Sequence, residues 1–249
     1  MTKKIKRAII SLSDKSEINL ILKILKKYRV SIISSGGTYK KINKLGYKST
    51  QVSKYTNTDE ILDGRVKTLH PKLYAGILSK REDKNHKKQL EKNNYNEIDL
   101  VIVNFYPFEE TLKKTKDHRK LVENIDIGGP TLVRAAAKNY KYTTVLTSPH
   151  QYDKFILDLE KNKGSTSLKL RKELSQEAFN LTAYYDSVIS EYLNKNNKDV
   201  FPKRKTIHGK LVEILRYGEN PHQKSAIYSK NDNLDILQLS GKKLSFNNY

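Results

Sequence analysis

Short apolar runs alternate with amphipathic stretches along roughly the first 148 residues of the chain. Five of the runs have the length and the flanking turn residues of β-strands. They lie at residues 8–13, 30–35, 75–78, 99–106 and 143–148. Strands that alternate with helical segments form a parallel sheet covered by helices, so this pattern predicts an α/β core.

Between the strands, the apolar residues recur at helical spacing. Ile18, Ile21, Leu22 and Leu25 fall on one face of a helix that follows the first strand. Another helix is expected around Pro130, because proline suits the first turn of a helix.

The pattern changes after residue 148, where long helical periodicity covers roughly 149–162 and 167–194. Strand- and loop-rich sequence follows beyond about residue 200. Three segments result: a core over 1–148, a helical extension over 149–199, and a final segment over 200–249. The final segment is too short to bury an independent core. We therefore expect it to be the incomplete start of a second α/β domain.

The composition excludes several classes of protein. The chain has 0 cysteines, so disulfides and thiolate metal sites are impossible, and its 6 histidines are scattered without the close pairing of a metal site. It has no apolar run long enough to span a membrane, and its N-terminus lacks a cleavage-like site, so we expect a cytoplasmic protein with no membrane partner.

The net charge of +21 raises the question of nucleic acid, because clustered Lys and Arg bind phosphate backbones. Here the lysines are spread almost evenly and accompany an excess of Asn and Ile. A drift of the genome toward A/T-rich codons, which favours Lys, Asn and Ile at solvent-exposed positions, explains this pattern better. A nucleic-acid partner is therefore not expected.

Two segments at predicted strand ends could bind a phosphate, because ligands of open α/β sheets bind at the carboxyl ends of strands. The segment SSGGT, residues 34–38, precedes a helical stretch, where backbone N–H groups and hydroxyls could surround an anion. At the neighbouring strand end, Ser11 and Lys15 offer a hydroxyl and a cation. An ordinary tight turn and a helix cap remain alternative explanations.

The segment GRVKTLHP, residues 64–71, brings cations together in an extended stretch. Arg65 and Lys67 would share one side of that stretch, and an anion between them would offset their mutual repulsion. A solvated basic loop is the alternative. His70 precedes a proline and is expected to form a local structural hydrogen bond.

Acid–base chemistry could come from two further segments. NFYPF provides Asn104 and Tyr106, and IDIGGPTLVRAAAKN provides Asp126 and Lys138. An aspartate, a tyrosine and lysines around one pocket could divide proton transfer and oxyanion stabilisation between them. Each of these residues alone also has a structural explanation as a cap, a core edge or a solvated helix position.

Six segments occur together along the chain: SLSDK, SSGGT, DGRVKTLHPKLYAGIL, NFYPFEET, ENIDIGGPTLVRAAAKN and LRYGENPHQ. In order and spacing they resemble the bifunctional purine-biosynthesis enzymes that combine AICAR transformylase with IMP cyclohydrolase. The resemblance covers essentially the whole chain. GRVKTLHP together with IDIGG and RAAAKN is highly specific, whereas SSGGT alone is not.

The resemblance implies a methylglyoxal-synthase-like α/β/α sandwich with a mostly parallel sheet over 1–148, extended by helices to 199 and followed by the start of the transformylase domain. It implies catalytic roles for Lys67, Tyr106, Asp126 and Lys138, the last as proton donor and acceptor. The substrate-binding residues it implies are Ser11, Lys15, Ser35, Gly36, Gly37, Thr38, Arg65, Thr68, Asn104, Ile127 (through its backbone) and Gly128.

The activity implied by the resemblance is ring closure of 5-formamidoimidazole-4-carboxamide ribonucleotide to IMP and water, by a homodimer and without a cofactor. In the second domain, Arg216 and Tyr217 match positions that bind the aminoimidazole ribonucleotide. The chain ends before the family's folate site, so formyl transfer from the co-substrate 10-formyltetrahydrofolate is expected to be absent from the chain as given.

Two other functions remain open. Folds of this type also serve as nucleotide-binding regulatory modules and as phosphate-eliminating lyases of the methylglyoxal synthase kind. The motifs KTLHP and IDIGG followed by AAAKN serve no evident purpose in either of these functions. A nucleic-acid-binding protein is the third possibility, and strong sensitivity to salt would reveal it.

Overall fold

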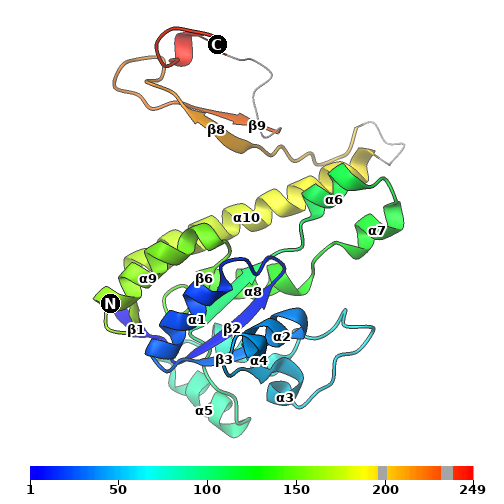
Figure 1. Cartoon of the computed structure of the whole chain (residues 1–249), viewed down its shortest axis with the longest axis vertical. Coiled ribbons are helices and arrows are strands. Elements are labelled where there is room, and N and C mark those ends of the chain that lie inside the picture. The colour runs from blue at the N-terminus through cyan, green and yellow to red at the C-terminus, as the bar shows by residue number, and fades with distance from the viewer. Residues whose placement is uncertain (196–200, 231–237, 249) are drawn as a thin grey trace. The chain divides into compact units, whose positions relative to one another are not determined.

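A five-stranded parallel sheet forms the centre of the fold (Figure 1). The computed structural model describes residues 1–195, 201–230 and 238–248. The sheet has the order β4-β3-β2-β5-β6. Its strands are β2 (Arg7–Leu12), β3 (Ser31–Ser34), β4 (Thr50–Gln51), β5 (Leu100–Asn104) and β6 (Thr144–Leu146). The α/β core that the sequence predicts is confirmed.

Helices cover both faces of this sheet. The α-helices between β2 and β7 along the chain are α1 (Ile18–Lys27), α2 (Gly36–Lys44), α3 (Val52–Thr56), α4 (Pro71–Leu78), α5 (Lys84–Lys92), α6 (Phe108–Lys114), α7 (His118–Glu123), α8 (Gly128–Lys138) and α9 (Tyr152–Lys161). The β2-to-β3 and β5-to-β6 connections run in opposite directions across the sheet, so right-handed crossovers place α1 and α8 on opposite faces. Helix α9 contacts α1, and α4 contacts α8.

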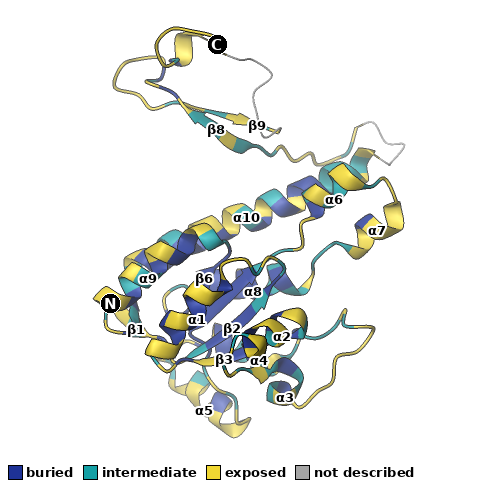
Figure 2. Ribbon diagram, viewed as in Figure 1, coloured by how far each residue is buried: buried dark blue, intermediate teal, exposed yellow. Residues whose placement is uncertain are grey.

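The core lies between the sheet and these helices. Figure 2 shows the strands buried and the outer faces of the helices exposed. Because both faces of the sheet are covered, the strands are continuous apolar runs without alternation, and Leu100, Val101, Ile102 and Val103 of β5 are all buried. The predicted apolar face of α1 is buried as well.

The prediction of a strand at 75–78 is wrong, because these residues belong to α4. Pro71 is the first residue of this helix, and the His70 Nδ1 accepts a hydrogen bond of 3.1 Å from the Lys72 N–H. This contact confirms the structural role expected for His70. Gly76 lets the helix approach the chain that leads into β5, since a Cβ there would lie 2.4 Å from the Asn96 carbonyl oxygen. The apolar run was too short to separate a buried helix from a strand.

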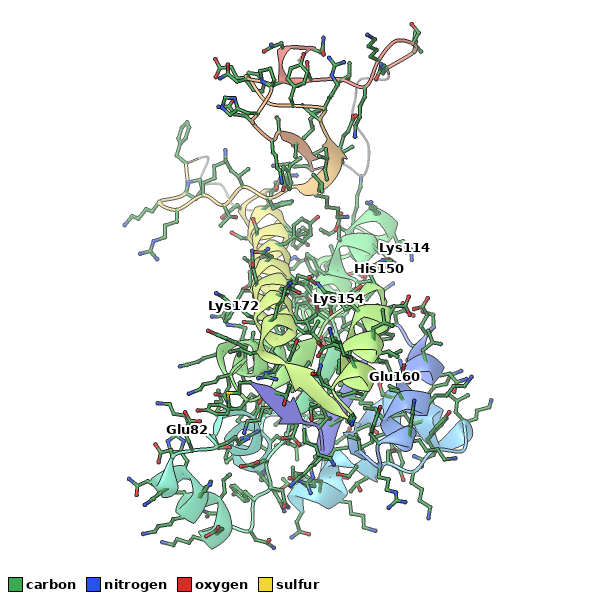
Figure 3. All side chains as sticks on the ribbon, turned by 90° about the vertical axis from the view of Figure 1, so that its left-hand side faces the viewer. Glu82, Lys114, His150, Lys154, Glu160 and Lys172 are labelled. Atoms are coloured by element: carbon green, nitrogen blue, oxygen red, sulfur yellow. The ribbon has the colours of Figure 1, made fainter. Side chains whose placement is uncertain are left out.

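Ion pairs join α9 to helices on either side of it. Helix α10 (Leu168–Lys195) follows β7 (Ser165–Ser167), which pairs with β1 (Thr2–Lys4). Lys154 of α9 lies 2.8 Å from Glu173 of α10, and Glu160 of α9 lies 2.5 Å from Lys27 of α1. Figure 3 shows Lys154 and Glu160 projecting from α9. These pairs complement the apolar packing of the helical extension.

The described chain forms two compact units, Met1–Thr182 and Ala183–Tyr249. Their boundary falls inside α10, whereas the expected boundary at 199–200 lies outside the described residues. The second unit contains the antiparallel pair β8 (Lys210–Ile214) and β9 (Ala226–Ser229), and the 3₁₀ turn Phe246–Asn248. Among the described helices, none combines the length and apolarity needed to cross a membrane.

The contact at Gly76 can be tested by substitution. Gly76→Ala would push a methyl group against the Asn96 carbonyl oxygen, and we expect a loss of about 1–3 kcal/mol in the free energy of unfolding. Urea titration followed by circular dichroism measures this loss. Ala75→Ser adds one heavy atom at the preceding position of α4 and should cost clearly less. Equal stability of Gly76→Ala and the wild type would contradict the close packing of α4.

Candidate functional site

A cleft of about 800 Å³ lies at the carboxyl ends of the central strands. The order of the sheet reverses direction between β2 and β5, and open α/β sheets bind ligands at such a point. Ser11 at the end of β2, Ser35 after β3 and Asn104 at the end of β5 all line the cleft. Two further segments complete its walls, the loop between α3 and α4 and the junction of α7 with α8.

The β3-to-α2 turn forms one wall of this cleft. Gly36 adopts a φ of +51°, which opens the first turn of α2, and Ser35 makes no side-chain capping bond within the described chain. The Thr38 hydroxyl accepts from the Leu12 N–H at 2.9 Å and donates to the Leu12 carbonyl at 3.1 Å. It thereby fixes the start of α2 against the end of β2. The first N–H groups of α2 are thus available to an anion.

Lys15 lies beside this helix start. Its Nζ donates to the Ser13 carbonyl at 2.9 Å, and a Cβ on Gly37 would lie 3.7 Å from the Lys15 Cε. Partial burial lowers the pKa of Lys15, and the nearby Asp14 carboxylate partly offsets this effect. The ammonium group therefore adds positive charge where the backbone donors of α2 begin.

Asn104 fastens the β2-to-α1 loop to β5. Its Oδ1 accepts from the Ser13 N–H at 2.6 Å and from the Asp14 N–H at 3.1 Å, while its Nδ2 donates to the Asp14 carbonyl at 2.8 Å. Asn104 lines the cleft as expected. Because both ends of its amide are engaged with backbone, however, its main task in this structure is to hold the loop in place.

The loop between α3 and α4 carries the basic motif across the cleft (Figure 1, cyan). Ile61 pairs with Val66, and the intervening Leu62, Asp63 and Gly64 have φ values of +54°, +53° and +84°. Three successive left-handed residues are costly unless surrounding structure holds them, and such strain concentrates at functional sites. The turn brings the residues that follow it into the cleft wall.

The two cations of this motif meet different carboxylates. The Arg65 Nη2 donates to the Glu123 Oε1 at the end of α7, and both side chains are exposed. Lys67 lies close enough to Asp126 to favour its ionised form. Arg65 and Lys67 therefore both line the cleft, each with a carboxylate nearby.

Asp126 is the most perturbed acid of the cleft. Burial raises its pKa, and this effect outweighs the opposing effects of hydrogen bonds from the Gly129 and Tyr106 N–H groups and of the Lys67 charge. The Gly129 N–H bond measures 2.9 Å. A carboxyl group held above its ordinary pKa beside a lysine is suited to proton transfer.

The paired glycines at the start of α8 make room for this acid. A Cβ on Gly129 would lie 2.4 Å from the Asp126 Oδ2, and a Cβ on Gly128 would lie 2.6 Å from the Thr68 Oγ1. Neither glycine has a left-handed φ, so close approach is the reason for glycine here. The GG of the IDIGG motif therefore fits α8 against Asp126 and the buried Thr68.

Nearly all residues predicted for the first domain line this one cleft. They are Ser11, Lys15, Ser35, Gly36, Gly37, Thr38, Arg65, Lys67, Thr68, Asn104, Tyr106, Asp126, Ile127 and Gly128. Lys138 does not join them. It is exposed at the far end of α8, ten residues beyond Gly128 at the cleft, which corresponds to about 15 Å along a helix axis. The catalytic role of Lys138 is implied by the resemblance alone, and its place on α8 is outside the cleft lining.

The sequence analysis assigned no role to Glu123, although it is the first residue of the quoted segment ENIDIGG. Glu123 and Asp63 both line the cleft. Asp63 immediately precedes the basic motif in the sequence, and Glu123 stands three positions before Asp126. The pairing of Glu123 with Arg65 joins the end of α7 to a loop, and no local pattern indicates their approach.

Arg216 and Tyr217 lie in the second unit. The Arg216 guanidinium stacks 4.8 Å from the centre of the Tyr217 ring and donates to its hydroxyl at 3.2 Å. A hydrogen bond from Ser245, together with Arg216, lowers the pKa of the Tyr217 phenol. Arg216 and Tyr217, which the resemblance implies as ribonucleotide contacts, therefore contact each other in this structure. Across the described residues, no cluster of acidic or histidine side chains could hold a metal ion.

The raised pKa of Asp126 predicts a pH dependence of stability. Because the folded state binds this proton more tightly than the unfolded chain, ionisation of Asp126 opposes folding. As the pH rises from the ordinary value of 3.8 through the raised pKa, the wild type should lose free energy of unfolding relative to Asp126→Asn. Paired urea titrations across this range measure the difference. A difference that stays constant or moves the other way would contradict the desolvation of Asp126.

Comparison with known proteins adds two family matches that together cover most of the chain. Residues 17–131 match the MGS-like domain, and residues 136–249 match the AICARFT/IMPCHase bienzyme. The crystal structure of ForH superposes with a TM-score of 0.69 at 27% identity, covering 78% of this chain and 100% of that chain. The expected methylglyoxal-synthase-like fold is thereby confirmed.

Curated relatives match the chain almost from end to end. The bifunctional purine biosynthesis protein PurH of Caldicellulosiruptor bescii is 46% identical over 98% of this chain and 49% of its own length. The PurH proteins of Persephonella marina and Rippkaea orientalis are 43% and 44% identical, over 98% and 97% of this chain. The chain spans about half the length of these relatives. From this similarity over nearly the whole chain, we conclude that the chain belongs to the family of bifunctional purine biosynthesis proteins.

Proposed function

We propose that this chain is an IMP cyclohydrolase, which closes 5-formamidoimidazole-4-carboxamide ribonucleotide to IMP and water. The observation that carries the proposal is the convergence of the α2 start, the Arg65–Lys67 motif and Asp126 on one cleft. An uncapped helix start suits the phosphate, and a lysine beside a carboxyl of raised pKa suits the proton transfers. Family membership supports the same reaction.

The phosphate is assigned to the start of α2. Its backbone N–H groups, the partial positive charge of the helix start and the Lys15 ammonium all favour a dianion. The start of α8 is less suited, because Asp126 already accepts from the Gly129 N–H and places a carboxylate there. The heterocycle is therefore assigned to the wall formed by Lys67, Tyr106 and Asp126.

Ring closure needs two proton removals and one oxygen departure. The carboxamide nitrogen attacks the formyl carbon, a C–N bond forms, and the formyl oxygen leaves as water with one proton from each of the two nitrogens. Asp126 in its ionised form accepts a proton from the attacking nitrogen, and the Lys67 ammonium donates to the developing oxyanion. Holding both reacting groups of one molecule in contact lowers the entropic barrier.

The reaction balances without an oxidant, a reductant or a transferred group, so we propose that it uses no cofactor. In line with the family, the proposal includes a homodimer in the cytoplasm and a small ribonucleotide as its partner. The assignment of Arg216 and Tyr217 to a ribonucleotide site stays part of this proposal, as does 10-formyltetrahydrofolate as co-substrate of formyl transfer in longer relatives.

The direct test supplies the formylated ribonucleotide without folate and follows IMP by ultraviolet absorbance. Wild-type chain should turn the substrate over, and Lys67→Ala should lower kcat/KM on the order of 10² or more through lost proton transfer. Lys88→Ala, on the exposed face of α5, is the matched control and should keep its activity. A folded wild type with no turnover would overturn the proposal.

The same samples separate the enzyme from a nucleic-acid-binding protein. Polyanion binding by scattered surface lysines should be equal in Lys67→Ala and Lys88→Ala and should collapse with added salt. The rate of cyclisation should instead be low in Lys67→Ala and normal in Lys88→Ala when the two are compared at the same salt concentration. Formation of methylglyoxal with release of inorganic phosphate from a triose phosphate would favour the lyase.

A further inference from the structure

Glu123 forms an ion pair with Arg65, a cation of the cleft that the proposed substrate would need. It accepts a hydrogen bond from the Arg65 Nη2, and both residues line the cleft. The side chains are 65% and 59% exposed, so the pair lies open to solvent and to an entering ligand. Exposed ion pairs of this kind are weak and exchange readily.

The charge balance of the cleft makes this contact unexpected. Along the described lining, Lys15, Arg65 and Lys67 face three carboxylates, Asp63, Glu123 and Asp126. This balance is neutral, although the chain as a whole carries +21. A dianionic phosphate ester therefore enters a cleft whose cations are already matched, and each carboxylate opposes its binding.

The local structure of α7 gives no reason for an acid at this position. Glu123 is the last residue of the helix, where the helix dipole disfavours a negative charge. Asp126 has a chemical role in the proposed reaction, and Asp63 lies in the left-handed turn. Glu123 is thus the carboxylate whose placement is explained mainly by Arg65.

We propose that Glu123 is an internal counter-ion, which holds Arg65 until the anionic ribonucleotide displaces it. The inference rests on the proposed cyclohydrolase function and extends it to a residue that sets affinity. When the ribonucleotide binds, the Arg65–Glu123 ion pair is lost, and the released Glu123 carboxylate repels the anionic ligand. Glu123 therefore weakens the binding of substrate and product alike and raises KM, while the chemical step is unaffected.

The direction of the change in ligand affinity after removal of Glu123 distinguishes a counter-ion from a residue that only positions Arg65. If Glu123 served only to orient Arg65, its removal would weaken ligand binding, and general damage to the fold would do the same. A counter-ion predicts tighter binding after removal, a result that neither alternative produces. The sign of the change in affinity is therefore the deciding readout.

The experiment measures IMP binding to the full chain by isothermal titration calorimetry at low salt, together with KM and kcat for cyclisation. Glu123→Gln should lower the Kd of IMP and the KM by about two- to fivefold, the effect of one exposed ion pair, with kcat nearly unchanged. Glu123→Ser is the second variant and should shift both constants in the same direction. Glu110→Gln is the matched control, because Glu110 pairs with Lys114 on α6 outside the cleft lining, and it should bind IMP like the wild type.

A double-mutant comparison assigns the effect to Arg65. In an Arg65→Gln background, Glu123→Gln should gain clearly less affinity than in the wild type. Unchanged or weaker IMP binding by both Glu123 variants would overturn the counter-ion role while leaving the cyclohydrolase intact. Failure of the wild type to bind IMP and to cyclise would instead overturn the proposed function, and this inference with it.

Discussion

The cleft depends on the hydrogen bonds that Asn104 makes across the switch point of the sheet. The amide at the end of β5 accepts from the Ser13 and Asp14 N–H groups and donates to the Asp14 carbonyl, so it fixes the loop that leaves β2. Thr38 fixes the other side of the same strand end through Leu12. These contacts satisfy backbone groups that have no partner in the sheet. With the loop held, the Ser13 carbonyl can accept from the Lys15 Nζ at 2.9 Å and keep the ammonium beside the start of α2.

Much of the fold follows from the sequence, because continuous apolar runs and the face of α1 indicate strands and a helix at nearly the correct residues. Failures occur where tertiary contacts decide. Residues 75–78 have a strand-like composition, yet Pro71 and the Gly76 contact with Asn96 make this segment a helix. The short strands β1 and β7 have no apolar signature, since their pairing only closes the edge of the helical extension.

The candidate site was predictable for residues that follow strands or belong to dense motifs, because the topology of a parallel sheet brings strand ends together. Lys138 shows the limit of this reasoning, since a motif that continues into a helix is carried away from the cleft. Glu123 shows the converse limit. Its partner Arg65 is 58 positions away in the sequence, and their contact joins the end of α7 to a loop that passes through a left-handed turn.

Two helices begin at the cleft, and the difference between them orders the proposed chemistry. The start of α8 is occupied by the carboxylate of Asp126, which Gly129 admits by having no Cβ. The start of α2 has Gly36 in a left-handed conformation and a Ser35 that makes no capping bond in the described chain. An anion is therefore favoured at α2 and opposed at α8, and for this reason the proposed function assigns the phosphate to α2. The same proposal assigns the heterocycle to the wall beside Asp126, where burial raises the carboxyl pKa.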